Sequence, residues 1–210
     1  MSKFDQPPKI EKTEVDYERR AEQMKAISEI ESASLPLTLM GGYAEDALLY
    51  GEPKGEHKDL DYILLREDVE RVRGYFVGQG YDVQDVTMPK KKQPYKLFAK
   101  KGTVDIDLVI FEHNPESNTH DLHVDDRESG ESVIFRLDDS LMQPESHQLS
   151  DTRVNTLAPL AFIHMREAAG ALARRPATDR DKRLITELKQ KYYPGVPADS
   201  EIFTPIIVKE

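Results

Sequence analysis

Two short runs of the sequence place aspartates at alternate positions, Asp-Leu-Asp at 59–61 and Asp-Ile-Asp at 105–107. In an extended strand, residues two apart point to the same face, so each run presents two carboxylates to one side of a sheet. Adjacent strands lie about 4.8 Å apart, which allows Asp59, Asp61 and Asp105 to converge. Such a cluster would repel itself without cations, and oxygen ligands alone suit Mg²⁺. Two such ions about 3.5–4 Å apart can support phosphoryl transfer.

The second feature is a glycine turn that can hold phosphate. An apolar run at 37–40 stops at Gly41 and Gly42, and residues 43–50 have the Ala and Leu content of a helix. A glycine turn that leads into a helix N-terminus presents free N–H groups to a phosphate without obstruction by a Cβ. A triphosphate would lie between these glycines and the metal.

The remaining elements of the first half can be predicted from hydrophobic spacing. We expect a first helix at 16–30, a strand at 59–65, and a helix that begins after Asp68, a plausible N-cap. A strand at 81–86 follows, and residues 95–99 and 103–111 read as two strands joined by a short hairpin connection.

The second half is less regular. Residues 112–150 read as a polar excursion in which 133–137 is the only good strand. Two helices are expected at 156–174 and 178–192, followed by an irregular tail. We therefore divide the chain into a main domain, 1–150, and a C-terminal helical annex, 151–210.

These features together resemble a known family. The segments that carry the resemblance are Gly-Gly-Tyr-Ala-Glu-Asp at 41–46, Glu-His-Lys-Asp-Leu-Asp at 56–61 and Val-Asp-Ile-Asp-Leu at 104–108. In this order they resemble the small nucleotidyltransferases of the DNA polymerase beta superfamily, and most closely the aminoglycoside and lincosamide nucleotidyltransferases. Residues 175–181 are also similar to a stretch between the two late helices of that branch. Gly55 and Ala177 depart from the pattern of the family.

The resemblance implies the nucleotidyltransferase fold, an α/β (α+β) arrangement with a mixed sheet and helices on one face. It implies that Asp59 and Asp61 bind metal, that Asp105 is a third ligand and the base toward the acceptor hydroxyl, and that Asp107 is a supporting carboxylate. The residues that it implies for nucleotide binding are Gly41, Gly42, Asp46, His57 and Lys58.

Three of these assignments have alternatives. Asp46 is equally consistent with a solvated helix residue, and His57 with a loop histidine that caps or hydrates. Asp107 is the rival of Asp105 for the base, because it lies one pleat further along the same face.

A histidine-rich and aspartate-rich stretch at 113–126 offers a weaker alternative, a Zn²⁺ site, because His nitrogens and carboxylate oxygens are good zinc ligands. Its candidate ligands are His113, His120, Asp121, His123, Asp125 and Asp126. The spacing does not match established zinc modules, so we favour a polar loop.

The composition limits the partners. The net charge is −10, which disfavours nucleic acid, whose binding depends on Lys and Arg, and suits a small cationic acceptor. The chain has no cysteine, no apolar run that approaches the length of a membrane helix and no apolar signal core near Met1, so we expect a cytoplasmic protein.

The resemblance, together with the carboxylates and the glycine turn, implies an enzyme that uses Mg²⁺ and ATP, or another nucleoside triphosphate, to move a nucleoside monophosphate onto a hydroxyl. An aminoglycoside-like acceptor is favoured. The alternatives are a toxin-type relative that acts on RNA or protein, a catalytically silent nucleotide-binding module, and a metal-dependent phosphohydrolase.

Overall fold

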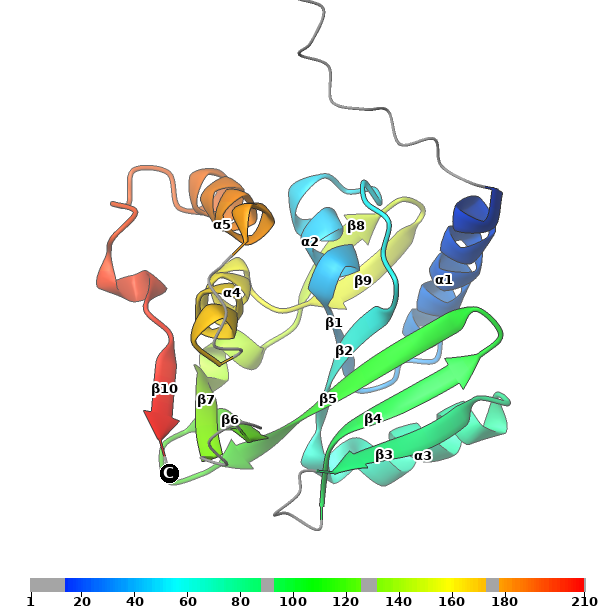
Figure 1. Ribbon diagram of the computed structural model, residues 1–210. Coiled ribbons are helices and arrows are strands. Elements are labelled where there is room, and N and C mark those ends of the chain that lie inside the picture. Colours follow the sequence, from blue (N-terminus) through cyan, green and yellow to red (C-terminus); the bar gives the residue numbers. More distant parts are fainter. Residues whose placement is uncertain (1–13, 88–92, 126–131, 173–177, 210) are drawn as a thin grey trace, which may run out of the picture.

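The computed structural model describes residues 14–87, 93–125, 132–172 and 178–209 (Figure 1). Its first half consists of α1 (Glu14–Ser32), β1 (Leu37–Met40), α2 (Gly41–Leu49), β2 (Leu60–Leu65), η1 (Arg66–Asp68), α3 (Val69–Gly78), β3 (Asp82–Thr87), β4 (Pro94–Lys101) and β5 (Val104–Asn114). The second half consists of β6 (Thr119–Asp125), β7 (Ser132–Asp138), η2 (Asp139–Met142), β8 (Glu145–Leu149), β9 (Thr152–Thr156), α4 (Pro159–Leu172), α5 (Asp179–Tyr192), η3 (Glu201–Phe203) and β10 (Ile206–Lys209). The order of helices and strands that we predicted up to residue 111 is confirmed.

The strands form one mixed sheet, as expected. Its order is β10-β7-β6-β5-β2-β1-β9-β8, with β4 paired to β5 and β3 paired to β4. The β2–β5 and β1–β9 pairs are parallel, whereas the β1–β2, β4–β5 and β5–β6 pairs are antiparallel. The long strand β5 pairs with β2 and β4 along its first part and with β6 at its end, so it joins the two parts of the sheet (Figure 1).

The pattern of burial explains why the carboxylates emerge on one face. Leu60, Tyr62 and Leu64 of β2 are fully buried, and so are Ile106 and Leu108 of β5. Because side chains alternate along a strand, the aspartates between them must point to the opposite face, where they are half-buried.

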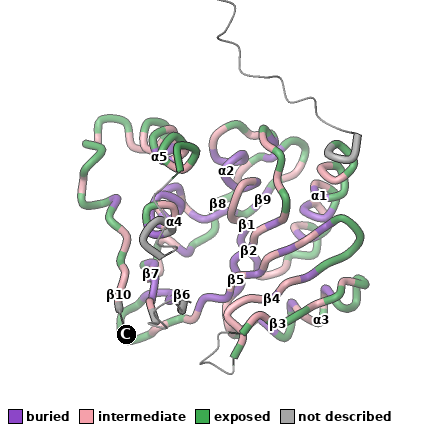
Figure 2. The backbone as a smooth tube through the Cα atoms, in the orientation of Figure 1, coloured by how far each residue is buried: buried purple, intermediate pink, exposed green. Residues whose placement is uncertain are grey.

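Helices cover the sheet and complete the core. In Figure 1, α1 and α3 lie behind the sheet, and α1 contributes Ala26, Ile27 and Ile30 to the buried core (Figure 2). Helices α4 and α5 contact each other, and α5 also contacts α2. The late helices are thereby attached to the element that follows the glycine turn. None of the helices in the described ranges combines the length and the apolar character that a membrane span requires.

The structure corrects three of our expectations about secondary structure. The polar region 112–150 contains not one strand but the end of β5 and all of β6, β7 and β8. The expected irregular tail includes β10, which pairs antiparallel with β7. Asp68 precedes α3, but its side chain makes no capping hydrogen bond.

Candidate active site

Three carboxylates come together at the centre of the sheet. Asp59, Asp61 and Asp107 each offer a ligand oxygen, and these oxygens lie within 4.8 Å of one another. Asp61 stands opposite Asp107 in the register of the parallel pair β2–β5, and Asp59 lies at the entrance to β2. Carboxylate oxygens at this density form the donor set that Mg²⁺ and similar hard cations prefer.

Burial and mutual repulsion disfavour the ionised forms of the carboxylates in this cluster. Burial raises the pKa of Asp61 to about 7, and the charges of Asp59 and Asp107 add to this increase. Burial and the charge of Asp107 also raise the pKa of Asp59. Lys96 donates to Asp107 Oδ2 at 2.7 Å and offsets part of the repulsion. The donor set therefore fits a divalent cation, which would stabilise all three ionised carboxylates together.

The structure places Asp107, and not Asp105, beside Asp59 and Asp61. Asp105 lies on the same face and contributes to the raised pKa of Asp59, but its Oδ1 is paired with Lys100 Nζ at 2.8 Å. The alternation along β5 is as predicted, but Asp107, rather than Asp105, stands opposite Asp61. Pairing between β2 and β5 sets that register, and local alternation does not specify it.

Gly41 connects the carboxylates to the start of α2. It follows Met40, which pairs with Asp61 across β1 and β2, and it has a φ of +66°. A Cβ at this position would overlap Asp61 Oδ2. Only glycine allows both this backbone conformation and this close approach.

The start of α2 is suited to bind an anion, because no side chain caps it at Met40. Its first N–H groups are therefore the donors that the glycine turn was expected to present to phosphate.

Asp46 and His57 form a pair next to this turn. His57 Nε2 lies 2.8 Å from Asp46 Oδ2, and both side chains are almost fully buried. A Cβ at Gly42 would overlap the imidazole ring at Nδ1, so His57 packs directly on the turn. Lys58, which was also expected at the nucleotide, is exposed between His57 and Asp59.

A second charged cluster joins α2 to the late helices. Glu45, only 3% exposed, accepts hydrogen bonds from Arg166 of α4, with Nε at 2.6 Å from Oε1. Arg166 Nη1 also lies 3.5 Å from Asp181 of α5, and Arg180 lies 3.8 Å from Glu45. Burial raises the pKa of Glu45, and the charge of Arg166 opposes this increase. The positive charge of Arg166 also acts on Asp61, so this cluster borders the carboxylates.

The expected similarity at 175–181 falls partly outside the described residues, since Arg175, Pro176 and Ala177 are not among them. The described part begins α5 with a capping box between Thr178 and Asp181.

The alternative zinc site at 113–126 is not formed by the residues that the structure describes. His123 Nε2 lies 3.9 Å from Glu112, Asp121 is paired with Arg136, and the His113 and His120 rings are 5.0 Å apart. In the described part of the chain, only the group Asp59, Asp61 and Asp107 brings three candidate ligand atoms together. Asp126 and the side chain of Asp125 lie outside the description.

Sequence reasoning missed Lys96, Glu45 and Arg166. Lys96 alternates with the buried Leu97 in β4, which would have placed it on the carboxylate face. Arg166 is a cation in an otherwise largely apolar helix segment, which was a signal for a buried partner. Nothing local identifies Glu45 as that partner, because 121 positions separate the two residues.

Known structures share this architecture. The lincosamide antibiotic adenylyltransferase LnuA, solved with lincomycin bound, matches with a TM-score of 0.52 and 17% identity, over 84% of this chain and 96% of that one. ANT(2")-Ia in complex with adenylyl-2"-tobramycin also gives a TM-score of 0.52, with 16% identity, over 81% of this chain and 86% of that one. The solution structure of ANT(2'')-Ia gives 0.55 with 16% identity, over 83% and 84% of the two chains. At these identities the likeness establishes the fold, which is that of the nucleotidyltransferases.

Sequence similarity also links the chain to a known family. No curated protein matches the chain in sequence. The sequence profile of the aminoglycoside-2''-adenylyltransferases matches residues 23–156, which include the glycine turn, Asp46, His57 and all three clustered carboxylates. This match covers more than half of the chain, and the protein therefore belongs to the aminoglycoside-2''-adenylyltransferase family.

Proposed function

We propose that the protein transfers AMP from ATP to a hydroxyl of a small cationic antibiotic and releases pyrophosphate. The observation that carries this proposal is the cluster Asp59, Asp61 and Asp107 facing the uncapped start of α2. One half suits divalent cations and the other suits phosphate. Two structural neighbours were solved with lincomycin and with adenylyl-2"-tobramycin bound, which supports an antibiotic as acceptor.

Each part of the site has a role in this reaction. Asp59, Asp61 and Asp107 would hold Mg²⁺, which when bound neutralises phosphate charge and favours loss of the hydroxyl proton. The N–H groups after Gly41 orient the triphosphate through hydrogen bonds. The net charge of −10 attracts a cationic acceptor toward the protein.

The transfer step is a substitution at the α-phosphorus. The acceptor oxygen forms a bond to that phosphorus while the bond to the bridging oxygen of pyrophosphate breaks, and pyrophosphate leaves with the bonding electrons. Lys96 binds Asp107 Oδ2, and we assign Oδ1 of the same carboxylate as the acceptor of the hydroxyl proton. Asp107 thus takes the role that the sequence favoured for Asp105, which is paired with Lys100.

The test is a transfer assay with ATP labelled at the α-phosphate, Mg²⁺, and tobramycin and lincomycin as acceptors. The expected result is a labelled antibiotic whose mass has increased by one adenylyl group, with pyrophosphate in equal amount. Asp61→Asn is the matched negative control. Label on RNA or protein instead would identify a toxin-type activity, and release of inorganic phosphate would identify a phosphohydrolase. ATP binding without any turnover would indicate a silent nucleotide-binding module.

A further inference from the structure

The segment between α2 and β2 is a loop that carries Asp59, yet it is fixed at several points. Asp46 Oδ2 accepts the backbone N–H of Lys54 at 2.7 Å and that of Gly55 at 3.4 Å, and it binds His57 Nε2 at 2.8 Å. A single carboxylate oxygen of α2 therefore contacts three residues of the loop. Burial raises the pKa of Asp46, but the hydrogen bonds from His57 and Lys54 outweigh it and lower the pKa, so Asp46 is ionised.

The imidazole of His57 fills the space between this loop and the glycine turn. Its Nε2 side faces Asp46, and its Nδ1 side lies where a Cβ of Gly42 would be. The Tyr43 ring packs against it with centroids 4.3 Å apart. With both edges of the ring occupied by protein, His57 has the environment of a spacer and not that of a phosphate ligand.

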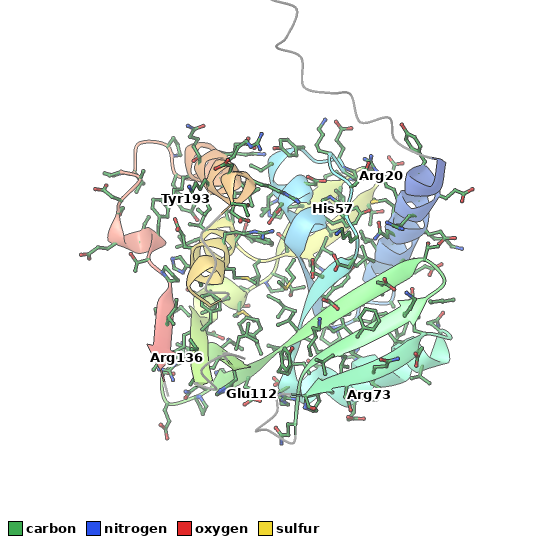
Figure 3. All side chains as sticks on the ribbon, in the orientation of Figure 1. Arg20, His57, Arg73, Glu112, Arg136 and Tyr193 are labelled. Atoms are coloured by element: carbon green, nitrogen blue, oxygen red, sulfur yellow. The ribbon has the colours of Figure 1, made fainter. Side chains whose placement is uncertain are left out.

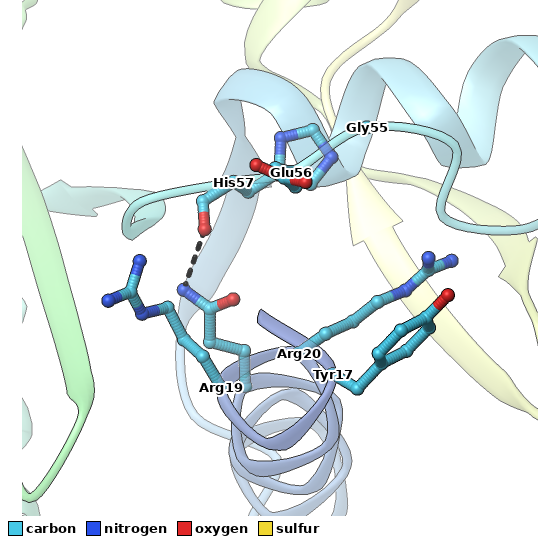
Figure 4. A pocket seen from close by; sticks show the side chains of 7 residues that line it. Tyr17, Arg19, Arg20, Gly55, Glu56 and His57 are labelled. Carbon is cyan, nitrogen blue, oxygen red and sulfur yellow. Dashed lines mark hydrogen bonds between the residues drawn. The ribbon is translucent and has the colours of Figure 1, made fainter. Parts of the chain in front are cut away.

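Helix α1 supports the same loop from the other side (Figure 4). Gln23, only 1% exposed, donates from Nε2 to the carbonyl oxygen of His57 at 3.3 Å and accepts from the Tyr43 hydroxyl at 2.9 Å. Arg20 donates to the carbonyl oxygen of Pro53. Figure 3 shows Arg20 and His57 approaching from α1 and from the loop. A buried glutamine with partners at both ends is costly to misplace, because either polar group would otherwise be left unsatisfied.

We infer that Asp46, His57 and Gln23 form a brace that sets the position of Asp59 relative to the glycine turn. His57 and Asp46 are positioning residues. This role rests on one part of the proposed function, namely that Asp59 binds a metal ion. The two halves of the site lie on different segments, and nine residues separate the end of α2 from the start of Asp-Leu-Asp. Ordering such a loop costs conformational entropy, which the brace offsets before any ligand binds.

The first experiment measures the brace without any ligand. Amide hydrogen exchange of Lys54 and Gly55 is compared in the wild-type protein, Asp46→Asn, His57→Ala and His57→Gln. We expect exchange about 10- to 100-fold faster in Asp46→Asn and His57→Ala, since a hydrogen bond to a charged group contributes this much to the opening equilibrium. His57→Gln should restore slow exchange, because its amide can donate to Asp46. Unchanged exchange in Asp46→Asn and His57→Ala would overturn the brace.

The second experiment separates positioning from phosphate binding. In His57→Ala at saturating Mg²⁺, we expect kcat to fall about 100-fold, the size of effect that a displacement of about 1 Å produces, while KM for ATP changes little. His57→Gln should recover most of kcat, and His113→Ala, at an exposed histidine far from the loop, should match the wild type. A large increase in KM for ATP with unchanged kcat would make His57 a phosphate ligand and overturn the assignment.

Gln23→Met provides a second variant if His57→Ala does not fold, with the same expected changes in exchange and kcat. Binding of Mn²⁺, followed by its electron paramagnetic resonance signal, should weaken in each brace variant whether or not an acceptor is known. If the brace results hold but no acceptor is ever adenylylated, the proposed function fails and the brace stands. Intact Mn²⁺ affinity in variants with fast loop exchange would contradict the link between the brace and Asp59.

Discussion

Asp61 and Asp107 stand directly opposite each other on the parallel strands β2 and β5, and with Asp59 they form a cluster of three candidate metal ligands. Asp105 faces the same side but is engaged by Lys100 at 2.8 Å. Asp107 is therefore a better candidate than Asp105 for a role at the cluster. The arrangement suits a bound cation, since three carboxylates so close together are mutually repulsive.

The ranking predicts opposite outcomes for two matched variants. Asp107→Asn should lower the rate of adenylyl transfer about 10²–10⁴-fold or more, because it removes both a metal ligand and the proposed base. Asp105→Asn should reduce the rate only slightly, since it loses a pairing with a half-exposed lysine. Single-turnover transfer measures both effects. If Asp105→Asn abolishes transfer while Asp107→Asn remains active, the register argument does not describe the working enzyme.

Metal and triphosphate binding should fail together when the cluster loses charge. Asp59→Asn and Asp61→Asn each remove an anionic ligand, so calorimetry should show strongly weakened binding of a nonhydrolysable ATP analogue in the presence of Mg²⁺. Asp151→Asn, at an exposed position of a turn, is the control and should bind as the wild type does. Undiminished affinity in the Asp59→Asn and Asp61→Asn double variant would refute the metal assignment.

The raised pKa of Asp61 predicts how stability depends on pH in the absence of metal. Its pKa is about 7 in the folded protein and 3.8 as a model value. Between these values the folded state binds more protons than the unfolded state, so the free energy of unfolding decreases as pH rises from about 4 to 7. Above pH 7 the full penalty is present. Urea denaturation across this range should show the decrease in the wild type and a smaller one in Asp61→Asn, and saturating Mg²⁺ should suppress it. A free energy of unfolding that rises through this window would contradict the assignment.

The features of the site that could be predicted from the sequence are those that depend on residues close together along the chain. Local signals gave β1, the glycine turn and the two Asp-x-Asp strands, because each depends on alternation or on glycine within a few residues. The placement of Asp107, rather than Asp105, opposite Asp61 depends on the pairing of β2 with β5, more than 40 positions apart, which local patterns do not specify. The strands β6, β8, β9 and β10 escaped prediction because their apolar alternation is weak. Strands β6, β8 and β9 belong to hairpins with short connections, whereas β10 becomes a strand by pairing with the distant β7.

Gly41 should be intolerant of any side chain. Alanine there must adopt a φ of +66°, which costs about 1–2 kcal/mol for a residue with a Cβ, and its methyl group would displace the Asp61 carboxylate. Gly41→Ala should therefore lose activity out of proportion to its loss of stability. Gly80→Ala, with a φ of +81° and open space around it, carries the same backbone cost without the contact and isolates the effect of Asp61. Equal activity in the two variants at equal stability would show that the approach of Gly41 to Asp61 has no functional role.

The last prediction concerns the pairing of Glu45 with Arg166, which attaches α4 to α2. Arg166→Met removes the main cation from a carboxylate that is only 3% exposed, and it leaves Arg180, at 3.8 Å, as a basic partner of Glu45. Breaking a buried ion pair in this way costs about 3–5 kcal/mol, because the remaining charge is not compensated. Replacing both partners, as Glu45→Met with Arg166→Met, removes the uncompensated charge and should cost much less than the single arginine variant. Urea denaturation of the two single variants and the double variant gives the coupling energy. Arg71→Met, at an exposed arginine of α3, should change stability by less than about 0.5 kcal/mol and serves as the control. Additive losses in the double variant would mean that Glu45 and Arg166 contribute independently, and other contacts, such as the hydrogen bonds from Lys191 and Tyr192 of α5 to the Leu48 carbonyl oxygen, would then hold the late helices to α2.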